Sequence, residues 1–500
     1  MNDAYLQINS AVGFILPEVF LLATVCLMFL AGPFLVSEGG KASAGLRHRW
    51  GTLSILTLAV AWGVWLRSPP SESAGPFRAD ALVWFIRGVS LSFGPILVLL
   101  LWNQIDDGHS AEAQACLLAI LAGVNLVVLA NDLVLLFLGL ELVSIPTYVF
   151  LYLPRRDWAT REATIKYFLL SVFSSALLLY GLAWLYGIAG TTNLPAIAER
   201  LRNVDAAEGG GMLRIVMALV IAGIGFRITA VPFHFYAPDV FQGVTSSAAA
   251  MLSFVPKVVG FAALLRLLPL LSGQTLLDWS PTDSLRTTLA VVAVVTMFGG
   301  NLLALRQTHV HRLLAYSSVA QAGYMLIGLC VGDAEGAGGL ASLLFYLVAY
   351  GMMTIGAFSV LAALGRGNRA VQTASDLAGL GRSQPVAALM LAVCLFGLTG
   401  LPPTIGFLGK LNLFLSGWSA GDVTGRVLAV VLGINAVIAA WYYLRLIAVM
   451  YLDEPTREPA PTWEIPAWIA AGVCATATLL TFIVPQWIMA AAERAADIRL

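Results

Sequence analysis

Charged residues are scarce in this sequence, and their scarcity excludes a soluble globular protein. Asp, Glu, Lys and Arg make up 11% of the 500 residues, whereas 59% are hydrophobic and the mean hydropathy is +0.85. Soluble domains are about 25% charged. The sequence therefore predicts a protein that folds within a lipid bilayer.

Clustered metal ligands and nucleotide-binding motifs are also missing. No CxxC pair occurs, the histidines lack the paired spacing of a haem or metal site, and there is no GxxxxGK[ST] stretch. The single cysteines lie in apolar segments and are interpreted as packing residues: Cys26, Cys116, Cys330, Cys394 and Cys474. The sequence therefore predicts no cofactor and no metal ion bound by this chain.

Long apolar runs recur along the whole chain. About fourteen runs of roughly 18 to 25 residues are each long enough to cross a hydrocarbon core of ~30 Å. They centre near Leu21, Ala59, Leu91, Ala122, Leu142, Ala176, Val220, Val255, Val294, Gly323, Ala349, Leu398, Gly433 and Thr476. The first run is too long for a signal peptide and follows no basic segment. The sequence predicts an all-α polytopic membrane protein with about 14 transmembrane helices.

The basic residues of the loops give a weak orientation signal. About twelve Lys and Arg lie on one side, against about nine on the other side; the richer side holds the loops near Arg47, Arg155, Arg306 and Arg369. Because basic loops favour the cytoplasm, both termini are predicted to be periplasmic.

Four ionisable residues lie well inside apolar runs: Glu141, Arg227, Lys257 and Lys410. A charge near the bilayer midplane costs about 3 kcal/mol on insertion scales, so such residues face a protein or water-filled interior and mark ion paths. The alternative is a set of structural ion pairs between helices. Four such residues on separate helices favour the ion path.

The side-chain chemistry of these residues separates their roles. A lysine can give up its proton inside a protein and take it back, whereas an arginine cannot be deprotonated there. Lys257 and Lys410 are therefore predicted to carry protons, and Arg227 to act only through its charge. Glu141 is predicted to be the acid partner that biases a neighbouring cation.

Other ionisable residues are weaker candidates. Those nearest the ends of their apolar runs are expected to reach the membrane interface by snorkelling: Glu18, Arg87, Lys166, Arg266, Arg306 and Arg445. Lys166 and His311 are kept as possible proton relays at a pathway mouth. His234 is a stronger relay candidate, because it lies in PFHFYAPDV, where Pro232 and Pro238 are expected to interrupt a helix.

Two proline-interrupted segments occupy matching places. Pro232 follows GIGFRITAV, and Pro402 and Pro403 interrupt FGLTGLPPTIGF at a distance of about five membrane helices. Such pairs are typical of repeated transporter folds, in which unwound backbone lines a cavity. The sequence predicts two inverted five-helix repeats at 111–270 and 285–450, with additional helices at 1–110 and 451–500.

Four long stretches carry a resemblance that spans nearly the whole chain. In order, they are LELVSIPTYVFLYL, GFRITAVPFHFYAPDVFQGV, NLLALRQTHVHRLLAYSSVAQAGYMLIGL and GLPPTIGFLGKLNLF. They resemble the antiporter-like membrane subunits of bacterial NADH-quinone oxidoreductase (complex I), which are related to Mrp-type cation/proton antiporters. The PFHFYAPDVFQG stretch is more similar to the subunit N group than to the L and M groups.

The resemblance implies an antiporter-like fold and a proton-translocating role in a membrane arm. The functional positions of the family match Glu141 in the fifth helix, Lys257 in the eighth and Lys410 in the twelfth. In the seventh helix the family usually carries lysine in GFKxxxxPFH, where this chain has Arg227. The arginine keeps the charge that would pair with Glu141, so its expected role is electrostatic.

The resemblance also implies partners. The chain would be a non-redox subunit of an NADH:quinone oxidoreductase in the bacterial inner membrane, with FMN, iron–sulfur clusters and quinone bound by other subunits. The expected neighbours are the antiporter-like subunits M and L and small subunits such as K and J, together with lipid but no nucleic acid. The alternatives are an Mrp-type cation/proton antiporter subunit and a purely structural membrane scaffold.

A three-step route follows from these assignments. A proton enters from the cytoplasm and protonates Lys257, whose affinity is set by Glu141 and Arg227. It then passes through waters near His234 to Lys410. It leaves toward the periplasm when a charge rearrangement, driven by quinone reduction in neighbouring subunits, lowers the proton affinity of Lys410.

Overall fold

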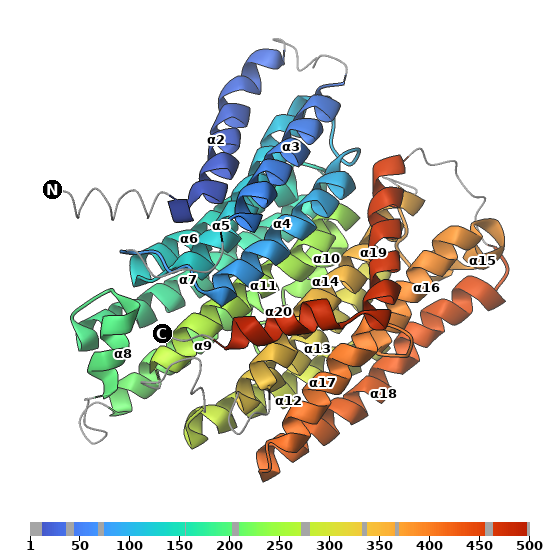
Figure 1. Cartoon of the computed structure of the whole chain (residues 1–500). Coiled ribbons are helices and arrows are strands. Elements are labelled where there is room, and N and C mark those ends of the chain that lie inside the picture. Colours follow the sequence, from blue (N-terminus) through green and yellow to red (C-terminus); the bar gives the residue numbers. More distant parts are fainter. Residues whose placement is uncertain are drawn as a thin grey trace.

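Helices make up the whole regular structure of the described part of the chain (Figure 1). The computed structural model describes residues 13–36, 45–68, 75–155, 157–202, 210–271, 281–332, 338–365, 370–455 and 464–497. The α-helices are α2 (Leu16–Ala31), α3 (Leu46–Leu66), α4 (Ala81–Leu101), α5 (Ser110–Leu129), α6 (Leu133–Tyr152), α7 (Trp158–Ala189), α8 (Leu194–Arg202), α9 (Gly210–Arg227), α10 (Ala237–Gly243), α11 (Ser246–Leu271), α12 (Asp283–Leu305), α13 (Val310–Val331), α14 (Gly339–Leu364), α15 (Leu380–Ser383), α16 (Pro385–Thr399), α17 (Ile405–Ser419), α18 (Val423–Leu452), α19 (Ile465–Ile483) and α20 (Gln486–Ala496).

The apolar runs of the sequence form these helices. Among the described residues, ten helices are long and apolar enough to cross a membrane, and α2 and α16 are shorter apolar helices. Each predicted centre of an apolar run lies in a helix. The all-helical membrane class is thus confirmed, whereas the number of spans and the repeat boundaries stay predictions.

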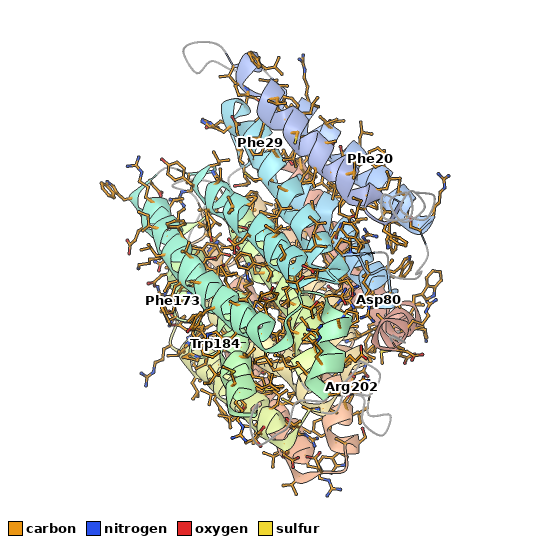
Figure 2. The ribbon with its side chains drawn as sticks, turned by 90° about the vertical axis from the view of Figure 1, so that its left-hand side faces the viewer. Phe20, Phe29, Asp80, Phe173, Trp184 and Arg202 are labelled. Atoms are coloured by element: carbon orange, nitrogen blue, oxygen red, sulfur yellow. The ribbon has the colours of Figure 1, made fainter. Side chains whose placement is uncertain are left out.

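The helices form a buried centre and an apolar periphery. In the most apolar 18-residue stretch of each helix, 100% of the residues of α11 and 94% of those of α13 are buried. In α7 and α18 the share is 39%. Figure 2 shows side chains of the outer helices, including the exposed Phe20 and Phe29 of α2 and Phe173 of α7. Large apolar side chains on the outside suit a lipid solvent, so α11 and α13 are the helices best placed to hold polar groups away from lipid.

Both predicted helix breaks are present. The helix α9 ends at Arg227, and the chain turns before α10, with Thr229 at a φ of +59°. The helix α16 ends at Thr399, and α17 begins at Ile405. The expectation that Pro238 interrupts a helix is wrong, because Pro238 lies in the first turn of α10, where its missing N–H costs no hydrogen bond.

Two opposite ends of the bundle are distinguished below by one residue each. The Arg155 face is the end at which α6 ends and α7 begins. The Asp80 face is the end at which α4 begins and α11 ends. The C-terminal helix α20 turns away from α19 and crosses the bundle (Figure 1), where it packs against α14 and α4.

Candidate functional site

A carboxylate and a guanidinium meet between α6, α7 and α9. Arg227 Nη2 lies 3.4 Å from Glu141 Oε1. The Ser175 hydroxyl donates to the same oxygen at 2.6 Å, and Arg227 Nη1 donates to Ser144 Oγ at 2.9 Å. The pairing predicted for Glu141 and Arg227 is therefore present, and two serine hydroxyls hold it in place.

The two members of this pair differ in their exposure. The Arg227 side chain is 7% exposed, whereas that of Glu141 is 23% exposed. Glu141 lies near the middle of α6, and its neighbours on that helix, Leu138 and Ile145, are exposed apolar side chains. The carboxylate thus opens toward the side of the bundle at membrane depth.

Lys257 lies at the centre of the molecule. It is fully buried on α11, and its Nζ donates to Ser318 Oγ at 2.5 Å. The Tyr350 hydroxyl donates to the same serine oxygen at 2.8 Å, and the ring centroid of Tyr350 is 5.6 Å from Nζ. In the described ranges no carboxylate forms an ion pair with Lys257, so hydroxyl oxygen and a ring face are its polar surroundings.

Lys410 is held at the second helix break. Its buried Nζ donates to the Leu398 and Thr399 carbonyl oxygens, both at 2.8 Å, and lies 4.9 Å from the ring centroid of Tyr324. These carbonyls end α16, where the helix dipole favours a cation. Gly400 has a φ of +88°, and a Cβ there would lie 2.8 Å from Lys410 Cδ. Glycine at this position therefore allows both the turn and the close approach.

Polar side chains of α13, α14 and α18 lie beside Lys410. The Leu398 carbonyl oxygen, which accepts from Lys410, also accepts from Gln321 Nε2 at 3.2 Å. The Tyr346 hydroxyl donates to Gln321 Oε1. The hydroxyl of Tyr443 accepts from Gln321 at 3.5 Å and is hydrogen-bonded to Ser317. A buried polar network thus extends from Lys410 toward the serines of α13.

The serines and the glutamine of α13 were not recognised as site residues in the sequence. Ser317 and Ser318 lie four and three residues before Gln321, so all three lie close together on one side of α13. Ser318 contacts Lys257, and Ser317 belongs to the network beside Lys410. The signal was the stretch YSSVAQ, whose neutral polar residues interrupt an apolar run with helical spacing.

His234 lies in the first break, as expected, but forms no hydrogen bond with either lysine among the described residues. Its imidazole is partly buried, and its Nδ1 has no hydrogen-bond partner among the described residues. Within the same part of the chain, no hydrogen bond connects His234 to Lys257 or Lys410. Its relay role stays a prediction.

A cavity of about 510 Å³ opens at the Arg155 face. Lys166 and Asp239 line it and form an ion pair of 2.9 Å, and Arg312 Nη1 pairs with Asp239 at 2.6 Å. Asp239 belongs to α10, whereas Lys166 and Arg312 belong to α7 and α13. The ion pairs therefore fix the segment after the first break between two other helices.

Two histidines lie at this cavity. The Nε2 of the buried His311 lies 2.9 Å from the hydroxyl of Ser246, the first residue of α11. His309 lies outside the membrane-spanning part of α13, and burial together with the Arg312 guanidinium lowers the pKa of its imidazole. A cavity wall with neutral imidazole and hydroxyl groups thus leads to the helix that carries Lys257.

The snorkelling prediction is wrong for three residues. Glu18 and Arg87 are buried and form an ion pair of 2.5 Å between α2 and α4. Arg266 is buried near the end of α11 and pairs with Asp80. Position along an apolar run does not reveal which neighbouring helix supplies a counter-charge, so these pairs could not be found from the sequence.

Metal-ligating side chains do not gather in the described ranges. No group of three or more His, Cys, Asp or Glu residues there could hold a metal ion. Four of the free cysteines are buried, and Cys26 is exposed on α2. That the chain itself binds no cofactor stays a prediction.

Comparison with known proteins places this arrangement in a family. The family model described as NADH:quinone oxidoreductase/Mrp antiporter matches residues 130–435, which include all four ionisable site residues. The NADH-quinone oxidoreductase subunit N of Trichlorobacter lovleyi is 35% identical over 99% of both chains. The NAD(P)H-quinone oxidoreductase subunit 2 of Synechocystis is 36% identical over 95% of this chain and 89% of its own.

Solved structures share the same fold. A chain of respiratory complex I from Thermus thermophilus is 27% identical, with a TM-score of 0.78 over 95% of this chain and 98% of its own. A chain of the Mrp complex from Dietzia is 19% identical and has a TM-score of 0.81 over 96% of this chain and 97% of its own, so it shows the fold alone. The chain therefore belongs to the NADH:quinone oxidoreductase/Mrp antiporter family, and within it to the NADH-quinone oxidoreductase subunit N group.

Proposed function

We propose that this chain is a proton-translocating membrane-arm subunit of a respiratory NADH:quinone oxidoreductase. Its curated relatives are subunits of such enzymes, and one structural relative belongs to respiratory complex I. Electron transfer from NADH to quinone, with its FMN and iron–sulfur clusters, takes place in partner subunits. This chain contributes ion transfer and no redox step.

The observation that carries the proposal is the pair of buried lysines on either side of the polar residues of α13. Lys257 donates to Ser318, and Lys410 donates to the carbonyl oxygen that also accepts from Gln321. Neither ammonium group has a carboxylate partner in the described part of the chain. A lysine in such surroundings can release its proton without leaving an unpaired buried anion.

The contacts outline one route through the chain, and we assign its direction from the predicted orientation in the membrane. A proton enters through the cavity at the Arg155 face, which we assign to the cytoplasm, and passes His311 and Ser246 at the start of α11. Lys257 lies about 16 Å farther along that helix, at 1.5 Å per residue. The hydroxyls of α13, α14 and α18 then lead to Lys410, with waters near His234 as a second relay. Release occurs toward the Asp80 face, which would be periplasmic.

Energy for this transfer has to come from outside the chain. Moving one charge against a membrane potential costs about 2.3 kcal/mol per 100 mV. Glu141 and Arg227 are placed to receive the driving signal, because the carboxylate opens toward the side of α6 at membrane depth. A neighbouring membrane-arm subunit, of the M, L, K or J kind, would cover Glu141 and change the field at Lys257.

Proton pumping by membrane vesicles tests the proposal. The Lys257→Ala variant is expected to lose NADH-driven proton uptake, because the first carrier is removed. Arg161→Ala is the control, since Arg161 is an exposed basic residue of α7 that lies over the ring of Trp158 and does not line the entry cavity. Native gels check that both variants are incorporated into the complex.

The outcomes separate the alternatives. Normal pumping by an assembled Lys257→Ala complex would contradict the proposal and favour a structural scaffold. Exchange of sodium for protons without NADH oxidation would instead favour an Mrp-type antiporter. Loss of pumping in Lys257→Ala together with normal pumping in Arg161→Ala is the expected result.

A further inference from the structure

Three charged side chains meet at the Asp80 face. Arg266, near the end of α11, donates from Nη1 and Nη2 to the two carboxylate oxygens of Asp80 at 2.6 and 3.0 Å. Arg78 Nε lies 2.6 Å from Asp80 Oδ2. Arg266 also donates twice to the Val128 carbonyl oxygen, from Nη2 at 2.8 Å and Nε at 3.2 Å. The cluster therefore joins α11 to the end of α5 and the start of α4.

The cluster carries an excess positive charge away from water. The exposed fractions of the Arg266, Asp80 and Arg78 side chains are 2%, 11% and 12%. Burial would raise the pKa of Asp80, but the two guanidinium groups lower it below its usual value, so the carboxylate is ionised. Burial and the charge of Arg266 lower the pKa of Arg78 only to about 10, so it stays protonated at neutral pH. Two cations and one anion leave a net charge of +1.

An ion pair in the second half of the chain, on the same face, carries no such excess. On the same face, Arg286 Nη2 pairs with Asp422 Oδ1 at 2.8 Å, one cation with one anion. These side chains are 22% and 31% exposed, more than those of the first cluster. The cluster at the end of α11 is thus positively charged and buried. The pair between α12 and α18 is neutral and more exposed to solvent.

The first cluster lies in line with Lys257. Both Lys257 and Arg266 belong to α11, and nine residues along a helix span about 14 Å. The helix between them is buried on all sides. A proton that approached Lys257 from the Asp80 face along α11 would have to pass a fixed cation in a medium that screens charge poorly.

We propose that Arg266 is an insulating residue that closes the Asp80 face to protons and keeps Lys257 in contact with the Arg155 face alone. The excess positive charge repels cations, while the hydrogen bonds to Asp80 and Val128 hold it in place. The inference rests on the proposed function, because it takes Lys257 as a proton carrier. It adds a reason why protons held by Lys257 move toward Lys410 instead of returning directly to the opposite face.

Passive proton leak is the measurement that tests this insulation. Vesicles containing the assembled complex are given a potassium diffusion potential without NADH, and a pH-sensitive dye follows proton movement. Arg266→Gln removes the charge but retains an amide donor, and is expected to accelerate the leak several-fold. Arg266→Lys keeps the charge and is expected to leave the passive proton leak unchanged. Arg78→Gln removes one charge without altering α11, and is expected to produce a smaller leak.

Asp80→Asn is the matched control for packing. Asparagine still caps α4, as Asp80 does by accepting from the Val83 N–H, but it breaks the ion pairs and increases the positive charge. Tight vesicles with Asp80→Asn support a charge barrier. A leak in both Asp80→Asn and Arg266→Gln would overturn the proposal, because loosened packing would then explain it. No leak in Arg266→Gln or Arg78→Gln would overturn it as well.

A double variant separates this inference from the proposed function. If the leak of Arg266→Gln passes through Lys257, adding Lys257→Ala removes it. A leak that persists in the double variant means that the route blocked by Arg266 bypasses Lys257, which overturns the insulating role assigned here. Loss of NADH-driven pumping in Lys257→Ala alone would still support the proposed function in that case.

Discussion

The buried ammonium groups of Lys257 and Lys410 are stabilised by different polar groups. Lys257 is bound by a serine hydroxyl and lies near a tyrosine ring, and the ion pair of Glu141 and Arg227 lies on helices nearby. Lys410 is bound by two peptide carbonyls at the end of α16 and lies over the ring of Tyr324. The groups in contact with Lys257 are a hydroxyl and a ring, with a side-chain ion pair on neighbouring helices, whereas Lys410 is held by backbone dipoles that stay fixed.

This difference indicates that proton affinity is regulated in the first predicted repeat, residues 111–270, and not in the second. A helix C-terminus stabilises a cation by about 0.3 to 2 kcal/mol whatever happens elsewhere. The carboxylate of Glu141 can respond to protonation and to a neighbouring subunit, and we propose that its charge acts on Lys257 through the field between the helices. The ion pair lies close to the helix that carries Lys257, because Arg227 packs against Gly260 of α11. A Cβ added at Gly260 would lie 3.5 Å from the Cβ of Arg227. We therefore expect the driving charge change near Glu141.

Replacing either lysine by arginine is expected to have the largest effect on NADH-driven proton pumping. Lys257→Arg and Lys410→Arg keep the positive charge but cannot release a proton, so NADH-driven pumping should be abolished in both. Pumping is measured in vesicles, with incorporation into the complex checked on native gels. Pumping by Lys257→Arg at the unmodified rate would mean that only its charge matters, and the first half would then act without proton transfer.

Neutralising Glu141 should have the next largest effect. Glu141→Gln leaves the guanidinium of Arg227 buried without its anion, and we expect pumping to fall about tenfold, which corresponds to about 1.4 kcal/mol. The control is Glu493→Gln on α20, whose side chain is exposed and does not line the entry cavity. The control should pump normally. An equal loss in both variants would show that pumping responds to any lost carboxylate and not to the charge of Glu141.

Removing one hydroxyl of the network beside Lys410 should have a moderate effect. The hydroxyl of Tyr443 joins Ser317 to Gln321, so Tyr443→Phe loses hydrogen bonds worth about 1 kcal/mol each, and we expect pumping to fall about fivefold. Tyr180→Phe is the control, because Tyr180 is exposed on α7 and lies outside the network beside Lys410. Tyr180→Phe should pump normally. Normal pumping by Tyr443→Phe would contradict a proton route through this network.

The sequence predicted the helices and the charged site residues but not the neutral groups between them. Apolar runs determine helices in lipid, because every backbone polar group must be satisfied within the segment. Lys257 and Lys410 could be recognised because a charge in an apolar run is costly. Serine and tyrosine cost far less, so Ser318 and Tyr350 gave no comparable signal.

Long-range charge pairs were the other part that the sequence could not supply. Arg266 and Asp80 are far apart in the chain, and each lies near the end of an apolar run, where snorkelling is the ordinary explanation. Only packing of α11 against α4 and α5 brings them together. The contact predicted between Glu141 and Arg227 was an exception, because a resemblance to the family indicated it.

Arg227→Lys should have the smallest effect and gives the sharpest test of the electrostatic role of this residue. Lysine keeps the charge opposite Glu141 but loses the second donor, which now reaches Ser144 and the Leu140 carbonyl oxygen. If Arg227 acts only through its charge, pumping should stay within about twofold, because one such hydrogen bond is worth about 1 kcal/mol or less. Arg227→Gln, which removes the charge, should instead slow pumping as much as Glu141→Gln does. A pumping rate in Arg227→Lys well above that of the unmodified complex would show that a third titrating cation is advantageous, and the first half would then carry protons at two positions and not only at Lys257.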